Sequence, residues 1–215
     1  MRLVLLLTLC LALVTGCASG RKLVLRGPTG PEEAKVREAL APLLPASGIW
    51  LSPRDGCALA LGVWQLRRID VGVGPHPRCK FALEVTTGAL RSLDEDELRT
   101  ALAHELGHVQ LGHVANRAAR RKAEEDAPAI QPSDEGTAMR HRAYDRDEEL
   151  AADRFAVTLL DKLPGTPGRG CASVMNLIER LDLERLTPGW SQWLKTHPTP
   201  GARLAALGDI CPKTR

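Results

Sequence analysis

Two histidines one helical turn apart, His104 and His108, constrain the fold of this chain more than any other feature of its sequence. The apolar residues around them recur at intervals of three and four, the period of an α-helix that buries one face. The segment Ser92-Leu93-Asp94-Glu95 precedes them and fits a capping box, so we expect the helix to begin there. Both imidazoles then project from the same face of one helix.

The residues near these histidines suit a hydrolytic metal site. Two neutral imidazole nitrogens can bind one zinc ion, and Glu105 can accept a proton from water at an open metal position. A second helix is expected from Asp147 to about Lys162, and it carries Glu149 and Asp153 one turn apart. This pair suits a third metal ligand and an acceptor that orients a ligating imidazole, although a solvated helix face is the alternative.

Three other histidines are expected to lie outside the metal site. His113 follows His104 by nine residues, which on a continuing helix turns its side chain half a turn away from the metal. It could share the metal only if the helix were interrupted. His76 and His141 are expected to be ordinary surface residues.

The N-terminus has the form of a secretory signal. Arg2 is followed by an apolar run over residues 3–14, which is shorter than the roughly 20 residues that a membrane-spanning helix needs. The run ends in Val14-Thr15-Gly16-Cys17, which resembles the lipobox of bacterial lipoproteins. This resemblance implies removal of residues 1–16 and a diacylglycerol on Cys17. A plain secretory signal is the alternative.

The remainder of the chain is expected to be one domain held at a membrane. Residues 17–30 look like a lipidated tether, and residues 31–215 contain no apolar run long enough to cross a bilayer. By resemblance to lipoproteins, Ala18 in place of an aspartate implies an anchor in the outer membrane that faces the periplasm.

Composition supports a globular domain and argues against a nucleic-acid binder. The 215 residues are 44% hydrophobic and 26% charged, which suffices for one core of useful size. The formal charge is +3, and loss of Arg2 with the signal leaves 28 basic against 26 acidic residues, or +2. A nucleic-acid binder would normally carry a dense basic face.

Four cysteines remain once the signal is removed and Cys17 is lipidated, namely Cys57, Cys79, Cys171 and Cys211. An even number in an oxidising compartment indicates two disulfides, and four cysteines allow three pairings. We expect Cys57 to pair with Cys79 and Cys171 with Cys211. A zinc–cysteine site is the competing interpretation, but no two of these residues have the close spacing of such sites.

Other segments are expected from local pattern and from turn residues. They are a helix from Pro31 to about Leu44, two strands within Ala58 to Val73, a third strand from Lys80 to Thr87, a polar surface excursion from about Ala123 to Tyr144, and helices over Cys171–Leu183 and Pro200–Leu207.

Three separated motifs occur in a recognisable order. They are the helix segment 104–108, the segment 149–153, and Thr196-His197-Pro198 followed by Arg203. In this order they resemble the zinc metallopeptidases that include HtpX, the CAAX prenyl protease and BepA, and the resemblance covers most of residues 80–207. The chain lacks the transmembrane helices and helical repeats of those proteins, so their substrates are not carried over.

The resemblance implies roles for individual residues. One zinc ion per chain would be held by His104, His108 and Glu149, with Glu105 as general base and general acid. His197 would lie near the zinc, where it could donate to the oxyanion as the peptide carbonyl is attacked, or could be purely structural.

Together these features predict an α+β fold of the minigluzincin type, in which the two motif helices pack on a small antiparallel sheet. The predicted function is zinc-dependent endopeptidase activity on unfolded or misassembled proteins of the cell envelope. The alternative is a zinc-containing lipoprotein that acts mainly as a chaperone or assembly factor. Glu105 counts against this alternative, because a binding role does not require a general base.

Overall fold

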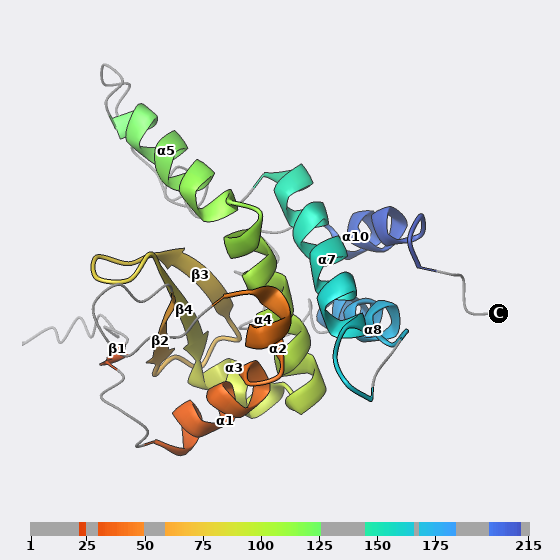
Figure 1. Cartoon of the computed structure of the whole chain (residues 1–215), viewed down its shortest axis with the longest axis horizontal. Helices are drawn as coiled ribbons and strands as arrows, with labels where there is room; N and C mark the ends of the chain where they lie inside the picture. Colours follow the sequence, from red (N-terminus) through yellow and green to blue (C-terminus); the bar gives the residue numbers. More distant parts are fainter. Residues whose placement is uncertain are drawn as a thin grey trace, which may run out of the picture.

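The computed structural model describes residues 22–24, 30–49, 59–125, 145–165, 168–183 and 198–211. These ranges form a sheet at one side of the molecule, helix α4 in the middle, and helices α7, α8 and α10 at the other side (Figure 1). The α+β class predicted from the sequence is confirmed.

The sheet has four strands in the order β1-β2-β4-β3. Its strands are β1 (Lys22–Val24), β2 (Leu59–Trp64), β3 (Val71–Pro75) and β4 (Phe81–Thr86). The pairs β1–β2 and β3–β4 are antiparallel, but β2 and β4 run parallel, so the expectation of a wholly antiparallel sheet is wrong. After β2 the chain crosses to β3 at the far edge, and β4 then returns between them. An alternating apolar pattern specifies the buried face of a strand and not the direction of its neighbour.

Helix α4 (Glu95–Gln110) begins at a capping box two residues later than the sequence pattern indicated. The Asp94 carboxylate accepts from the Glu97 backbone N–H at 2.8 Å, and the Glu97 carboxylate accepts from the Asp94 N–H at 2.8 Å. Ser92 instead ends a short helix, α3 (Thr87–Ser92), which the sequence pattern does not indicate. The α3 segment turns the chain from the end of β4 into α4.

Helix α7 (Arg146–Asp161) lies against α4 and has a capping box of its own, formed by Asp145 and Glu148. The two helices approach closely at Gly107. A Cβ atom at this glycine would lie 3.1 Å from the Ala152 Cα and 3.1 Å from its carbonyl oxygen. The absence of a side chain at Gly107 therefore lets α7 bring its first turn close to the two histidines of α4.

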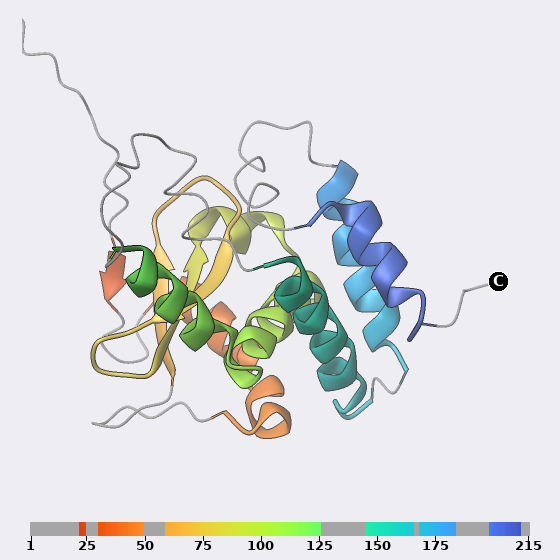
Figure 2. The ribbon, with the colours of Figure 1, turned by 90° about the horizontal axis from the view of Figure 1, so that it is seen from above.

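Helix α4 does not continue through His113. It ends at Gln110, and a new helix, α5 (His113–Glu125), begins after Gly112, whose φ of 77° is left-handed. Glycine adopts this conformation without the steric cost that other residues bear. Helix α5 changes direction and passes over the edge strand β3 (Figures 1 and 2).

The remaining helices enclose the core. The expected N-terminal helix is divided at Ala41 and Pro42 into α1 (Pro31–Leu40) and α2 (Leu43–Ser47). Helices α8 (Gly170–Leu183) and α10 (Pro200–Leu207) lie side by side beyond α7 (Figure 2). The largest fully buried apolar side chains are Leu40, Leu43, Leu59, Leu83, Leu98, Leu102, Leu106, Leu159, Ile178 and Leu207.

A disulfide joins Cys171 at the start of α8 to Cys211 after α10, which confirms the predicted C-terminal pairing. Cys79 is also disulfide-bonded, but its predicted partner, Cys57, lies outside the described residues. The signal, the lipidation motif and residues 126–144 of the polar excursion lie outside them as well. Within the described ranges, no helix combines the length and apolar character needed to cross a membrane.

Candidate metal centre

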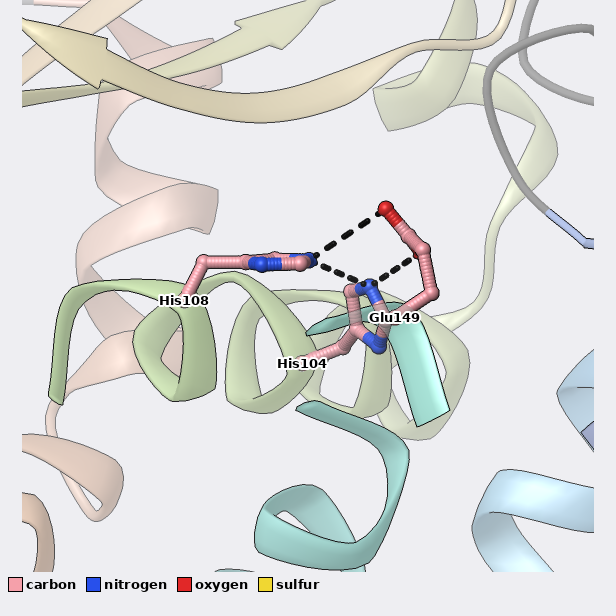
Figure 3. Close-up of side chains that lie close together, drawn as sticks. All are labelled: His104, His108 and Glu149. Carbon is pink, nitrogen blue, oxygen red and sulfur yellow. Dashed lines mark hydrogen bonds and ion pairs between the residues drawn. The ribbon is translucent and has the colours of Figure 1, made fainter. Parts of the chain in front are cut away.

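Three side chains predicted as metal ligands converge between α4 and α7 (Figure 3). The Nε2 atoms of His104 and His108 are 3.1 Å apart. Glu149 lies above them, with 3.4 Å from its Oε2 to His104 Nε2 and 3.6 Å from its Oε1 to His108 Nε2. All three side chains are buried. Two helices that are far apart in the sequence thus contribute three donor atoms to one point.

These residues fit a zinc ion. Two imidazole nitrogens and one carboxylate oxygen form a typical donor set for hydrolytic zinc. Zinc bonds of about 2.0–2.2 Å in a tetrahedral site place neighbouring ligand atoms about 3.3–3.6 Å apart. The two imidazole nitrogens are 3.1 Å apart, and each has a different Glu149 oxygen at 3.4 or 3.6 Å, so all three distances lie close to that range.

His104 is held by a chain of buried polar contacts. Its Nδ1 lies 2.9 Å from Asp153 Oδ1, so this carboxylate can accept the ring N–H and direct Nε2 toward the cluster. Arg203, from α10, donates its Nε–H to Asp153 Oδ2 at 2.8 Å and a second N–H to Oδ1. Burial alone would raise the pKa of Asp153, but the charge and hydrogen bonds of Arg203 hold it well below its usual range.

The spacing of Glu149 and Asp153 predicts Asp153 as the orienting acceptor, but no such spacing in the sequence predicts a role for Arg203. Arg203 is 3% exposed and lies in a short helix whose other residues are small or apolar. The sequence signal for such a role was the single arginine among small and apolar residues of this helix. A charged side chain that is buried with such a helix needs a partner of opposite charge or a hydrogen-bond acceptor.

The cluster attracts positive charge. Burial would lower the pKa of His104, but hydrogen bonds to Asp153 and Glu149 outweigh it and raise the pKa to about 10. The two carboxylates thus favour a cation at the ring. A metal ion and a proton compete for this nitrogen.

Glu105 has the surroundings of a general base. Burial raises its pKa to about 8, although the charge of His104 acts in the opposite direction. Its Oε2 is buried and has no hydrogen-bond partner among the described residues. A carboxylate with a raised pKa can take up and release a proton near neutral pH.

His113 does not point away from the site, so the expectation based on a continuing helix is wrong. Its Nδ1 lies 3.0 Å from His108 Nδ1, the ring nitrogen that faces away from the cluster, and the side chain is buried. Burial lowers the pKa of His113, although Glu148 and Asp145 act in the opposite direction. Gly112 provides the interruption, and a glycine directly before His113 was the signal available in the sequence.

The other candidate histidines are not part of the described cluster. His76 Nδ1 accepts from the backbone N–H groups of Arg78 and Cys79, at 3.2 and 3.0 Å, and so stabilises the turn between β3 and β4. His141 and the predicted oxyanion donor His197 lie outside the described residues.

Known proteins resemble this chain in sequence and in fold over the region that carries the cluster. Residues 81–210 match the model of peptidase family M48. The crystal structure of S. mikatae Ste24p has a similar fold, with a TM-score of 0.50 and 16% sequence identity over 88% of this chain and 52% of that protein. The chain therefore spans about half the length of that structure. No individual curated protein matches the sequence.

The family match confirms the resemblance found in the three motifs. It includes β4, both motif helices and α10, which together carry every residue of the cluster and its Asp153–Arg203 support. Because the match extends over more than half of the sequence, the chain belongs to peptidase family M48.

Proposed function

We propose that this member of peptidase family M48 is a zinc-dependent endopeptidase of the bacterial envelope, in which His104, His108 and Glu149 hold one zinc ion and Glu105 is the general base. The observation that carries the proposal is the buried convergence of two imidazole nitrogens and one carboxylate, whose ligand atoms, one from each residue, all lie within 4.8 Å of one another. Glu105 follows His104 in the chain, and one of its buried oxygens is available for a water proton.

Each residue has a defined part in peptide hydrolysis. Bound zinc would polarise the scissile carbonyl and lower the pKa of the attacking water. Glu105 takes a proton from this water and passes it to the nitrogen of the leaving amine. Asp153 keeps the Nδ1 proton on His104, so that Nε2 presents its lone pair to the metal.

Extended, unfolded protein segments are the proposed substrates. Strand β3 lies at the edge of the sheet and packs beside α4, the helix that carries the histidines. Apart from the Val73 carbonyl, which accepts from Arg117, the backbone of this edge strand can pair with an added extended segment. An unfolded chain supplies such segments more readily than a folded one.

The variant Glu105→Gln tests the proposed enzymatic activity. Glutamine has nearly the same shape but cannot accept the water proton, so hydrolysis of an unfolded protein should fall by about 10² to 10⁴-fold. Zinc content, measured by atomic absorption, should stay at one ion per chain. A chelator should abolish activity in the wild type.

Equal cleavage by wild type and Glu105→Gln would refute this proposal. If neither protein cleaves any peptide while both suppress aggregation of an unfolded protein, the chaperone function would replace it.

The proposed location is the outer membrane, facing the periplasm, with removal of residues 1–16 and a lipid on Cys17. The support is the apolar run that ends in the lipobox-like Val14-Thr15-Gly16-Cys17. A Cys17→Ser variant should then move from the membrane to the soluble periplasmic fraction, as followed by fractionation and immunoblotting. Unchanged membrane association would contradict lipidation.

A further inference from the structure

The two ring nitrogens of His108 have different surroundings. Nε2 faces the cluster, 3.1 Å from His104 Nε2 and 3.6 Å from a Glu149 oxygen. Nδ1 faces the start of α5, where it lies 3.0 Å from His113 Nδ1. When Nε2 binds a metal, the ring proton must be on Nδ1, and that buried N–H requires an acceptor.

We propose that His113 is a positioning residue for the metal centre. Its Nδ1 accepts the Nδ1–H of His108 and so fixes the tautomer and ring orientation that direct His108 Nε2 toward the metal. This inference rests on the proposed function, in which His108 is a zinc ligand.

The two histidine ligands are therefore supported by chemically different acceptors. His104 donates to Asp153, whose negative charge is compensated by Arg203. His108 donates to an imidazole, which accepts a hydrogen bond without bringing another negative charge into the site. This difference matters because Glu149 and Asp153 already place two buried carboxylates beside the histidines.

Helix α5 is anchored so that His113 stays in contact with His108. Gly112 turns the chain back toward the site with its φ of 77°. One turn further along, Arg117 Nη2 donates to the Val73 carbonyl of β3 at 2.6 Å. Arg120 Nη2 lies 2.8 Å from Glu148 Oε2, on α7. His113, Arg117 and Arg120 recur at the spacing of one helix face, so a single face of α5 reaches the metal helix, the edge strand and α7.

Zinc affinity measured by competition with a chromophoric chelator tests this role. His113→Leu removes the acceptor, and we expect the zinc dissociation constant to rise by about 10 to 100-fold. His113→Asn places a side-chain oxygen near the position of Nδ1, so its affinity should stay close to that of the wild type. Arg120→Ala is the matched control, because it loosens α5 from α7 without touching His108.

Several results would overturn the proposal. Wild-type affinity in His113→Leu would do so, as would an equal loss in His113→Asn. An equal loss in Arg120→Ala would show that the position of α5, and not the acceptor, supports the metal. Absence of zinc binding in the wild type would instead refute the proposed function on which this inference rests.

Nitrogen NMR of the zinc-loaded wild type gives a test that does not depend on the folding of any variant. We expect a proton on His108 Nδ1 and a nitrogen–nitrogen coupling across the hydrogen bond to His113. A His108 ring without a proton on Nδ1 would contradict the proposal, even if His113→Leu fails to fold.

Discussion

Arg203 and Asp153 form a charged pair that water hardly reaches, with side chains 3% and 1% exposed. Removing two charges from water is costly, and two-point contact between guanidinium and carboxylate compensates for that cost. The same carboxylate contacts His104 Nδ1, so the pair also positions a candidate metal ligand. The contribution of Arg203 should therefore be visible in the stability of the zinc-free protein.

Arg203→Met should lower the free energy of unfolding by about 3 kcal/mol, because it leaves the Asp153 carboxylate buried without its main partner. Urea denaturation of the zinc-free protein measures this loss. The double variant Arg203→Met/Asp153→Leu should recover part of it, since no unpaired charge remains. A loss below about 1 kcal/mol in the single variant would be typical of an exposed ion pair and would contradict the buried one.

At the scale of elements, the geometry of the site depends on two glycines near the end of α4. Gly107 allows α7 to approach, which brings Glu149 to the histidines. Gly112 ends the helix and redirects the chain into α5, which brings His113 to His108. Gly107 is required because α7 leaves no space for a side chain there. Gly112 is required because its backbone is left-handed.

Gly112→Ala should destabilise the protein by about 1–2 kcal/mol, because an L-residue with a left-handed backbone is strained. A Cβ there meets no atom within 4 Å, so the loss would come from conformation and not from a clash. Gly201→Ala is the control, since its Cβ also meets no atom within 4 Å and its φ is negative. This change should be neutral or slightly stabilising. Thermal unfolding compares the two, and equal losses would argue against backbone strain at Gly112.

For the molecule as a whole, the C-terminal disulfide links the start of α8 to the chain just after α10. Cys171 and Cys211 are 40 residues apart, and between them lies α10 with Arg203. The crosslink therefore restricts the unfolded chain over the whole segment that completes the site.

Replacing both cysteines by serine should lower the free energy of unfolding by about 4 kcal/mol, the value for a closed loop of 40 residues. Denaturation of wild type and the Cys171→Ser/Cys211→Ser variant, both without reductant, measures the loss while the disulfide of Cys79 stays intact. A loss under about 1 kcal/mol would mean that the crosslink constrains the unfolded chain little.

The local features of the site could be predicted from the sequence pattern. Helical period placed His104 and His108 on one face of α4, and the same pattern located α7 with Glu149 and Asp153 one turn apart. Even there, the predicted start of α4 was two residues too early, because Ser92 ends α3 and Asp94 caps α4. These features depend on contacts within a few residues, so a linear pattern can specify them.

Which distant residues meet depends on the tertiary structure. It made β2 parallel to β4, paired Arg203 with Asp153, and turned His113 back onto His108. A period specifies the buried face of an element but not the element that covers it, and a glycine permits a left-handed turn without requiring one. Those choices follow from packing of the whole core and from the need of buried polar groups for partners, which no single segment of the sequence contains.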